Sequence, residues 1–104
     1  MTAGIDAAPQ DLAILTQALR AHLPPGVQVL AFGSRATGHA KPWSDLDLCL
    51  RGPVARSALS ALREALVDSD LPWRVDLLFW DDLEESFQKI IARDGVDLTE
   101  AKNA

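Results

Sequence analysis

The chain has 104 residues, 48% of them hydrophobic, which suits one domain with a modest core. It carries 10 basic and 15 acidic side chains, a formal net charge of −5, and an acidic surface is a poor match for a nucleic-acid backbone. We therefore expect no direct nucleic-acid substrate, and the single cysteine, Cys49, excludes a disulfide within the chain.

We expect no export signal in the N-terminal residues. The opening MTAGIDAAPQD has neither the basic n-region nor the apolar h-region of a signal peptide, and no apolar run is long enough to cross a bilayer. We expect a cytoplasmic protein that does not bind membranes, with a flexible segment at residues 1–8 and one domain over residues 9–104.

The first half of the chain alternates apolar periodicity with strong breakers. Leucines at helical spacing predict a helix over residues 9–22, which a Pro-Pro-Gly turn ends. A strand over residues 27–32 follows, then a short helix over residues 34–37 bounded by glycines. Residues 39–44 are expected to form a loop.

The second half contains two more strands and two more helices. A clean alternation predicts a strand over residues 45–50, and a second apolar stretch predicts another over residues 73–80. A helix over residues 53–67 begins with a proline, and a further helix runs from Asp82, as its cap, to a stop at Gly95. The stripe expected to be buried on the helix over residues 53–67 is Val54, Ala58, Leu62 and Ala65.

This order of elements predicts an α/β (α+β) fold, in which helices pack on one face of a small mixed β-sheet. The tail, residues 96–104, is expected to add a short edge strand. The other face of the sheet would carry acidic side chains from the strands over residues 45–50 and 73–80.

Two of these acids, Asp45 and Asp47, lie two residues apart on a predicted strand. Period-two geometry puts them on one face, about 6.5–7 Å apart at their bases. Like charges at that separation repel unless a cation lies between them, and Mg²⁺ prefers carboxylate and phosphate oxygens. Taken alone, alternating Asp and Leu also suits a solvated strand face.

Asp76 is the third candidate carboxylate. If its strand pairs beside the strand of Asp45 and Asp47, its side chain joins the same face. Three carboxylates there can hold two metal ions about 3.5–4 Å apart, an arrangement that assists in-line displacement at phosphorus. The alternative is that Asp76 is an ordinary acid of a strand.

Gly33 and Ser34 form the candidate phosphate site, where a strand gives way to a short helix. Glycine lets the backbone approach a phosphate closely, and the hydroxyl and N–H groups at a helix start can bind phosphate oxygens. Arg35 directly follows and is a candidate nucleotide contact, or else a plain surface arginine. Trp43, in the next loop, either stacks on a base or a partner, or anchors the loop.

The string GSRATGHAKPWSDLDL resembles the motif of the polymerase-beta-like nucleotidyltransferase superfamily. It has Gly33-Ser34, ten intervening residues and then Asp45-Leu46-Asp47, and it is most similar to the small bacterial minimal nucleotidyltransferases. Residue identity, spacing and the predicted secondary structure all agree with that motif. The likeness extends through Asp76 to the segment IIARDGV near the end of the chain. The resemblance implies the palm fold of that superfamily.

The resemblance also implies a reaction. ATP binds with Mg²⁺, two ions being expected, and an acceptor hydroxyl attacks the α-phosphate with loss of pyrophosphate. Asp45, Asp47 and Asp76 would hold the metal ions, Asp76 would also help to deprotonate the nucleophile, and Gly33 and Ser34 would hold the β- and γ-phosphates.

Minimal nucleotidyltransferases are commonly paired with a HEPN-domain RNase toxin. The resemblance therefore implies an antitoxin that adds AMP to a tyrosine hydroxyl of such a partner, within a heteromeric complex. Two alternatives stay open: an antitoxin that masks its toxin by binding with little turnover, and a transferase acting on a small molecule such as an antibiotic. The absence of a second substrate domain argues against the small-molecule acceptor.

Overall fold

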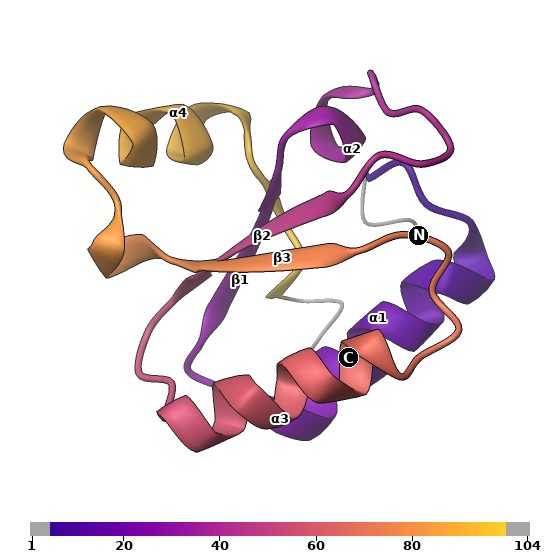
Figure 1. The fold of residues 1–104 in the computed structure, drawn as a ribbon. Helices are drawn as coiled ribbons and strands as arrows, with labels where there is room; N and C mark the ends of the chain where they lie inside the picture. Colours follow the sequence, from indigo (N-terminus) through magenta and orange to yellow (C-terminus); the bar gives the residue numbers. More distant parts are fainter. Residues whose placement is uncertain (1–4, 100–104) are drawn as a thin grey trace.

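The computed structural model describes residues 5–99 and resolves them into a mixed α/β fold. In chain order the elements are α1 (Pro9–His22), β1 (Gln28–Phe32), α2 (Ser34–Thr37), β2 (Leu46–Arg51), α3 (Arg56–Val67), β3 (Val75–Phe79), the 3₁₀ turn η1 (Trp80–Asp82), α4 (Glu85–Asp94) and β4 (Val96–Asp97) (Figure 1). The helices predicted over residues 9–22 and 34–37 have the predicted bounds.

The four strands form one mixed sheet in the order β3-β2-β1-β4. β1 is antiparallel to both β2 and β4, whereas β2 and β3 run parallel. β4 is the short edge strand predicted in the tail, and β3 is the strand at the opposite edge. Residues 100–104 of that tail lie outside the described part of the chain.

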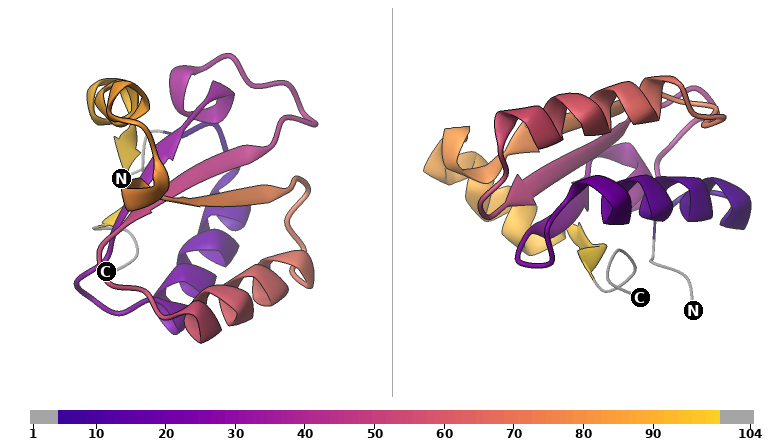
Figure 2. Two further views of the ribbon diagram at one scale, coloured as in Figure 1. Left: turned by 60° about the vertical axis from the view of Figure 1, so that its left-hand side comes forward. Right: turned by 90° about the horizontal axis from the view of Figure 1, so that it is seen from below.

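Helices α1 and α3 cover one face of the sheet (Figures 1 and 2). Their buried leucines pack against the apolar side chains that the strands direct to that face. The helical members of this core are Leu15, Leu19, Leu59, Leu62 and Leu66, and the strand members include Val29, Ala31, Leu46, Leu48, Leu50 and Leu77. The predicted fold class, a small mixed sheet with helices packed on one face, is confirmed.

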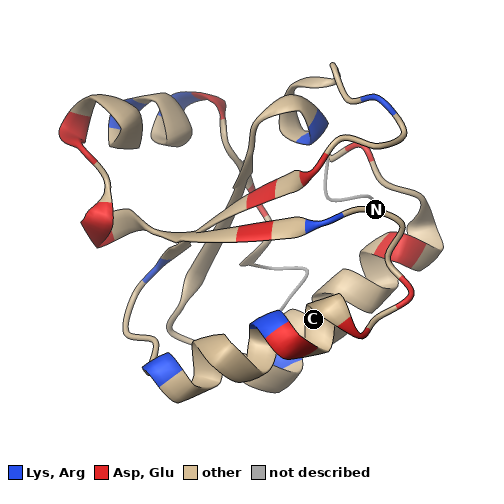
Figure 3. Cartoon of the chain, in the orientation of Figure 1, with Lys and Arg blue, Asp and Glu red and all other residues tan. Residues whose placement is uncertain are grey.

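Helix α4 adds a smaller cluster on the opposite face. Ile91 packs with Leu30 and Cys49, so the cysteine is a buried filler between strand and helix. Phe32 meets Phe87 edge to face at a centroid distance of 5.5 Å. α4 therefore covers one end of this face (Figure 2), and the acidic positions of β2 and β3 lie away from it (Figure 3).

The predicted helix over residues 53–67 starts later than expected. α3 begins at Arg56 after Ala55, because Gly52 has a φ of +132° and the chain continues extended through the N-cap. Its buried residues are Leu59, Leu62 and Leu66 instead of the predicted stripe, of which only Leu62 is fully buried. Both stripes have helical spacing, and the larger side chains face the core.

The last helix also begins later than predicted. Asp82 does not cap it, since residues 80–82 form a 3₁₀ turn and α4 starts at Glu85 after Glu84. Gln88 fixes this junction by donating from Nε2 to the Trp80 carbonyl at 2.7 Å. Gly95 does end the helix, as predicted, although in an extended conformation.

Part of the N-terminal segment contacts the folded domain. Residues 1–4 lie outside the described part of the chain, but Ile5 and Ala7 pack against the core. The Asp6 N–H donates to the Arg35 carbonyl at 2.8 Å. Within residues 5–99, no helix has the length and apolarity needed to span a membrane.

Candidate active site

Asp47 and Asp76 are direct neighbours in the parallel register of β2 and β3. Residues paired in this way direct their side chains to the same face of a sheet. On the other side of β2, Asp47 pairs with Phe32, the last residue of β1. The register therefore places Asp47 between Asp76 and the end of β1, where the turn at Gly33 begins.

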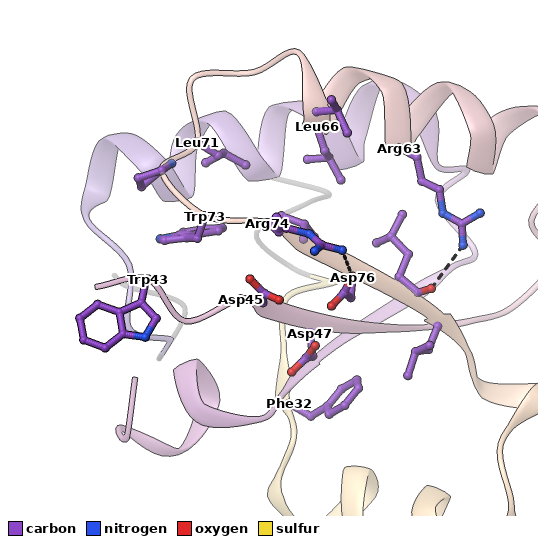
Figure 4. A pocket seen from close by; sticks show the side chains of 15 residues that line it. Phe32, Trp43, Asp45, Asp47, Arg63, Leu66, Leu71, Trp73, Arg74 and Asp76 are labelled. Atoms are coloured by element: carbon purple, nitrogen blue, oxygen red, sulfur yellow. Dashed lines mark hydrogen bonds and ion pairs between the residues drawn. The ribbon is translucent and has the colours of Figure 1, made fainter. Parts of the chain in front are cut away.

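Asp45 completes the group one residue before β2 begins. The predicted strand over residues 45–50 is shifted by one residue, but Asp45 still lines the same cleft as Asp47 and Asp76 (Figure 4). The cleft has a volume of about 890 Å³, the size of a small-molecule site. Figure 3 shows the acidic positions of β2 and β3 side by side.

The acids influence one another electrostatically. Burial raises the pKa of Asp47, and the negative charges of Asp76 and then Asp45 raise it further. Arg74 offers some compensation, with its Nη2 3.7 Å from Oδ1 of Asp76, but this pair is solvent-exposed and weak. A bound cation would relieve the repulsion more fully.

The donor set of this cleft suits a hard cation. Asp45, Asp47 and Asp76 supply only oxygen, the ligand atom that Mg²⁺ prefers. Within residues 5–99, no three side chains of His, Cys, Asp or Glu are grouped closely enough to hold a metal ion. Substrate phosphate oxygens are the usual remaining ligands of Mg²⁺, so a partial protein site fits a metal that arrives with a nucleotide.

Gly33 lies against the Asp47 side chain, although neither Gly33 nor Ser34 is among the residues that line the cleft. Its φ of +81° is unfavourable for any residue with a side chain, and a Cβ there would lie 2.5 Å from Oδ2 of Asp47. Glycine thus allows both the turn and the close approach of the carboxylate.

Ser34 opens α2 immediately after this glycine. The first N–H groups of a helix have no partner within the helix, so they are available to an oxygen ligand. The Ser34 carbonyl accepts from the His39 N–H at 3.0 Å, and Gly38, with a φ of +80°, ends the helix. Ser34 is therefore held in a closed, four-residue turn that directly follows the glycine in contact with Asp47.

Arg35 has a different environment from the one its sequence position suggested. Its residue is only 5% exposed, and its guanidinium lies 4.7 Å from the centroid of the Trp73 ring. It donates to four backbone carbonyls, those of Asp6, Lys41, Pro42 and Ser44. A guanidinium with these partners braces the loop before β2, so we leave Arg35 out of the proposed nucleotide contacts.

Trp43 is on the surface at the mouth of the cleft. It is 73% exposed, with Nζ of Lys41 5.7 Å from its ring centroid. This exposure does not suit an anchor for the loop and leaves the indole face accessible to a ligand.

Two arginines, Arg63 and Arg74, also line the cleft, and the sequence pattern predicted no functional role for either of them. Arg74 was detectable, because it lies two residues before Asp76 on one strand and so shares its face. Arg63 was not, because it comes from α3, and only the packing of α3 against the sheet brings it there.

Comparisons with known proteins agree with this geometry. Residues 12–98 match the family model described as a nucleotidyltransferase domain. The chain is 45% identical over 93 residues to a probable protein adenylyltransferase MntA of Haemophilus influenzae, an alignment that covers 88% of this chain and 81% of that protein.

Two solved structures share the fold. One is a toxin–antitoxin crystal structure with AMP-PNP, with a TM-score of 0.66 and 21% identity over 84% of this chain and 71% of that chain. The other is a mutant of the toxin–antitoxin MntA-HpeT, with a TM-score of 0.59 and 18% identity over 84% and 70%. The family match and the alignment with the 45% identical relative each span most of this chain. The predicted resemblance is therefore confirmed, and the chain belongs to the nucleotidyltransferase family.

Proposed function

We propose that this chain is a Mg²⁺-dependent adenylyltransferase that moves AMP from ATP to a tyrosine hydroxyl of a HEPN-domain RNase toxin, acting in the cytoplasm as the antitoxin. The observation that carries the proposal is the register of Asp47 against Asp76 beside the turn at Gly33. The 45% identical relative is named a probable protein adenylyltransferase, which supports a protein acceptor.

In the proposed reaction the acceptor oxygen forms a bond to the α-phosphorus, the bond to the bridging oxygen breaks, and pyrophosphate leaves. Gly33 and Ser34 hold the β- and γ-phosphates through backbone N–H groups and the hydroxyl. Asp76 accepts the proton of the attacking hydroxyl, which its half-exposed position at the rim allows, since 47% of its side chain is accessible.

The metal would be held by Asp45, Asp47 and Asp76. When bound, Mg²⁺ supplies neutralisation of the triphosphate charge and of the charge that develops on the leaving group. Its arrival would stabilise the charged form of Asp47, which burial and two neighbouring acids disfavour. The protein's own contribution is then mostly positioning and charge complementarity.

Intact mass spectrometry tests the proposal. The protein is incubated with Mg²⁺, ATP and the toxin encoded by the neighbouring gene, carrying a substitution that inactivates its nuclease. We expect the toxin to gain the mass of one or more adenylyl groups on a tyrosine. The gain should vanish with Asp45→Asn or Asp47→Asn and persist with Asp81→Asn, an exposed acid outside this cleft.

Two other outcomes would replace the proposal. A tight complex with no mass gain in either protein would indicate that the chain neutralises the toxin by masking it. Adenylylation of a small-molecule hydroxyl, with the toxin unmodified, would indicate a small-molecule transferase.

A further inference from the structure

β3 lies at an edge of the sheet, and its unpaired side is part of the cleft that holds the carboxylates. Among residues 5–99, only β2 pairs with β3. An unpaired strand edge presents a row of backbone donors and acceptors to any extended chain that reaches it. Here that row begins beside a proposed catalytic carboxylate, Asp76.

The register identifies which backbone groups face outward. The Leu46 N–H donates to the Arg74 carbonyl at 2.8 Å, so the groups of Arg74 and Asp76 point toward β2. The groups of the alternate residues, Val75 and Leu77, therefore point away from the sheet. The Leu77 carbonyl accepts a hydrogen bond from Nη2 of Arg63 at 3.5 Å, which shows that it faces outward. This side chain must move aside before another strand can pair with that carbonyl, whereas the N–H groups of Val75 and Leu77 are not involved in this contact.

The cleft follows this edge between two rims (Figure 4). One rim holds the carboxylates on the open face of the sheet. The other is largely apolar and comes from the end of α3 and the loop after it, namely Leu66, Val67, Leu71 and Pro72. Val67 is 82% exposed, a large apolar area for the last residue of a helix.

We propose that the acceptor segment of the partner polypeptide binds as an extended strand along β3, pairing with the backbone of Val75 and Leu77. This inference rests on the proposed transfer to a polypeptide hydroxyl and names the way in which that acceptor binds. Strand addition of this kind derives affinity from main-chain hydrogen bonds and specificity from alternate side chains.

Strand geometry then fixes what the segment must contain. The residue opposite Asp76 directs its side chain to the carboxylate face, with its Cβ about 4.5–5.5 Å from that of Asp76. This is the position for the hydroxyl that receives AMP. The residues before and after it point the opposite way, toward the rim at Leu66 and Val67, so they should be apolar.

A second copy of the chain is a poorer occupant of the same edge. Each copy carries a net charge of −5, and pairing β3 with β3 would bring two carboxylate clusters together. The partner strand is expected to be free of acids on the face that meets Asp76.

Amide hydrogen exchange by NMR tests the binding mode directly. We expect the amides of Val75 and Leu77 to exchange readily in the isolated protein, and to slow by at least about tenfold when the nuclease-inactivated toxin is added. The amide of Asp76, already paired with β2, should change little. Unchanged exchange at Val75 and Leu77 in a formed complex overturns the inference, as does protection of both amides without toxin through self-association.

A proline variant provides a second test. Val75→Pro removes one outward N–H, and an edge strand tolerates proline on its free side. We expect at least about a tenfold loss of AMP transfer to the toxin, with the thermal shift caused by Mg²⁺ and ATP retained. Glu84→Pro is the matched control, since Glu84 is exposed, has a φ of −64° and lies outside the cleft.

These measurements separate the binding mode from the reaction. Transfer by Val75→Pro at the wild-type rate overturns strand addition and leaves the proposed function standing. Protection of the Val75 and Leu77 amides with no AMP transfer by the wild-type protein overturns the proposed function and leaves the binding mode standing. If Val75→Pro does not fold, the exchange experiment on the wild-type protein decides alone.

Discussion

Gly33 and Asp47 fit together only because Gly33 has no side chain, since a Cβ there would lie 2.5 Å from Oδ2 of Asp47. The turn that ends β1 and the carboxylate on β2 are therefore one structural unit. The same glycine has a φ of +81°, so two independent requirements select it.

Gly33→Ala should abolish most of the transfer activity. The new methyl group displaces the Asp47 carboxylate, and misplacing a catalytic group by about 1 Å can cost about 100-fold in rate. The positive φ should also lower the free energy of unfolding by about 1–2 kcal/mol. Steady-state adenylylation rates and the melting temperature measure the two effects.

Gly38→Ala is the matched control for that prediction. Gly38 has nearly the same φ, +80°, but nothing lies within 4 Å of the position its Cβ would take. Its ψ of +14° places Gly38 in the left-handed helical region, whereas Gly33 has a ψ of −162°, so Gly38→Ala should lose less stability than Gly33→Ala and keep its activity. Equal loss of activity in both variants would show that backbone strain, and not the contact with Asp47, is responsible.

Asp47→Asn should make the ligand-free protein more stable while it inactivates the enzyme. Burial, Asp76 and Asp45 raise the pKa of Asp47 above its unfolded value, so its charged form opposes folding at neutral pH. A neutral amide removes that penalty, and we expect the melting temperature to rise by a few degrees at pH 7 without metal. A lower melting temperature than that of wild type would contradict the proposed like-charge repulsion, and Asp81→Asn should leave the value unchanged.

The sequence was sufficient for the elements with strong local boundaries. α1 lies between a proline at its first position and the Pro-Pro-Gly turn, and α2 lies between Gly33 and Gly38, so both were predicted residue by residue. The starts of α3 and α4 were not, because Ala55 and Glu84 make no side-chain cap and tertiary packing sets where these helices begin.

The site was predictable where it depends on period-two geometry and not where it depends on long-range backbone contacts. The common cleft of Asp45, Asp47 and Asp76 follows from strand alternation once β2 and β3 pair. The environment of Arg35 could not be foreseen, because its partners are backbone carbonyls of two separate segments. A carbonyl is present at every residue and leaves no pattern in the sequence.

Arg35→Lys should lower the stability of the fold and leave ATP binding and AMP transfer nearly unchanged. An ammonium group cannot reproduce the fork that donates to four carbonyls, nor the stacking on Trp73. We expect a loss of about 2–3 kcal/mol in the free energy of unfolding, a fall in melting temperature of roughly 10 °C or more, because four part-buried hydrogen bonds and the contact with Trp73 are lost together. Below that melting temperature, the KM for ATP should stay within about twofold of wild type, because a residue that only braces a loop adds little to nucleotide binding.

The opposite pattern would return Arg35 to the nucleotide site. A KM for ATP raised by about tenfold or more, with an unchanged melting temperature, would mean that the guanidinium leaves its carbonyls to bind phosphate. Thermal unfolding with and without Mg²⁺ and ATP distinguishes these cases in one experiment.

Asp97→Ala should weaken the attachment of β4 to β1, and the resulting loss of stability should depend on pH. Asp97 accepts hydrogen bonds from Nε2 of Gln28 at 3.0 Å and from the N–H of Thr99 at 2.8 Å, and these tie β4 and the residues after it to β1. Burial alone would raise the pKa of Asp97, but the hydrogen bonds from Thr99 and Gln28 outweigh it and hold that pKa below its ordinary value. A carboxyl whose pKa is lower in the folded state stabilises the protein above its unfolded pKa, and this stabilisation is lost as the pH falls through the folded value.

At pH 7 we therefore expect Asp97→Ala to lower the free energy of unfolding by about 1 kcal/mol, the usual worth of such hydrogen bonds. Below the folded pKa of Asp97 the wild type loses the same contribution, so the two unfolding curves should converge once the pH falls below that pKa. Asp70→Ala, which removes an exposed acid between α3 and β3, is the control and should track wild type at neutral and at low pH. Because Asp97 lies at the opposite edge of the sheet from Asp76, AMP transfer below the melting temperature should be unaffected, and a loss of transfer would mean that β4 supports the cleft through β1.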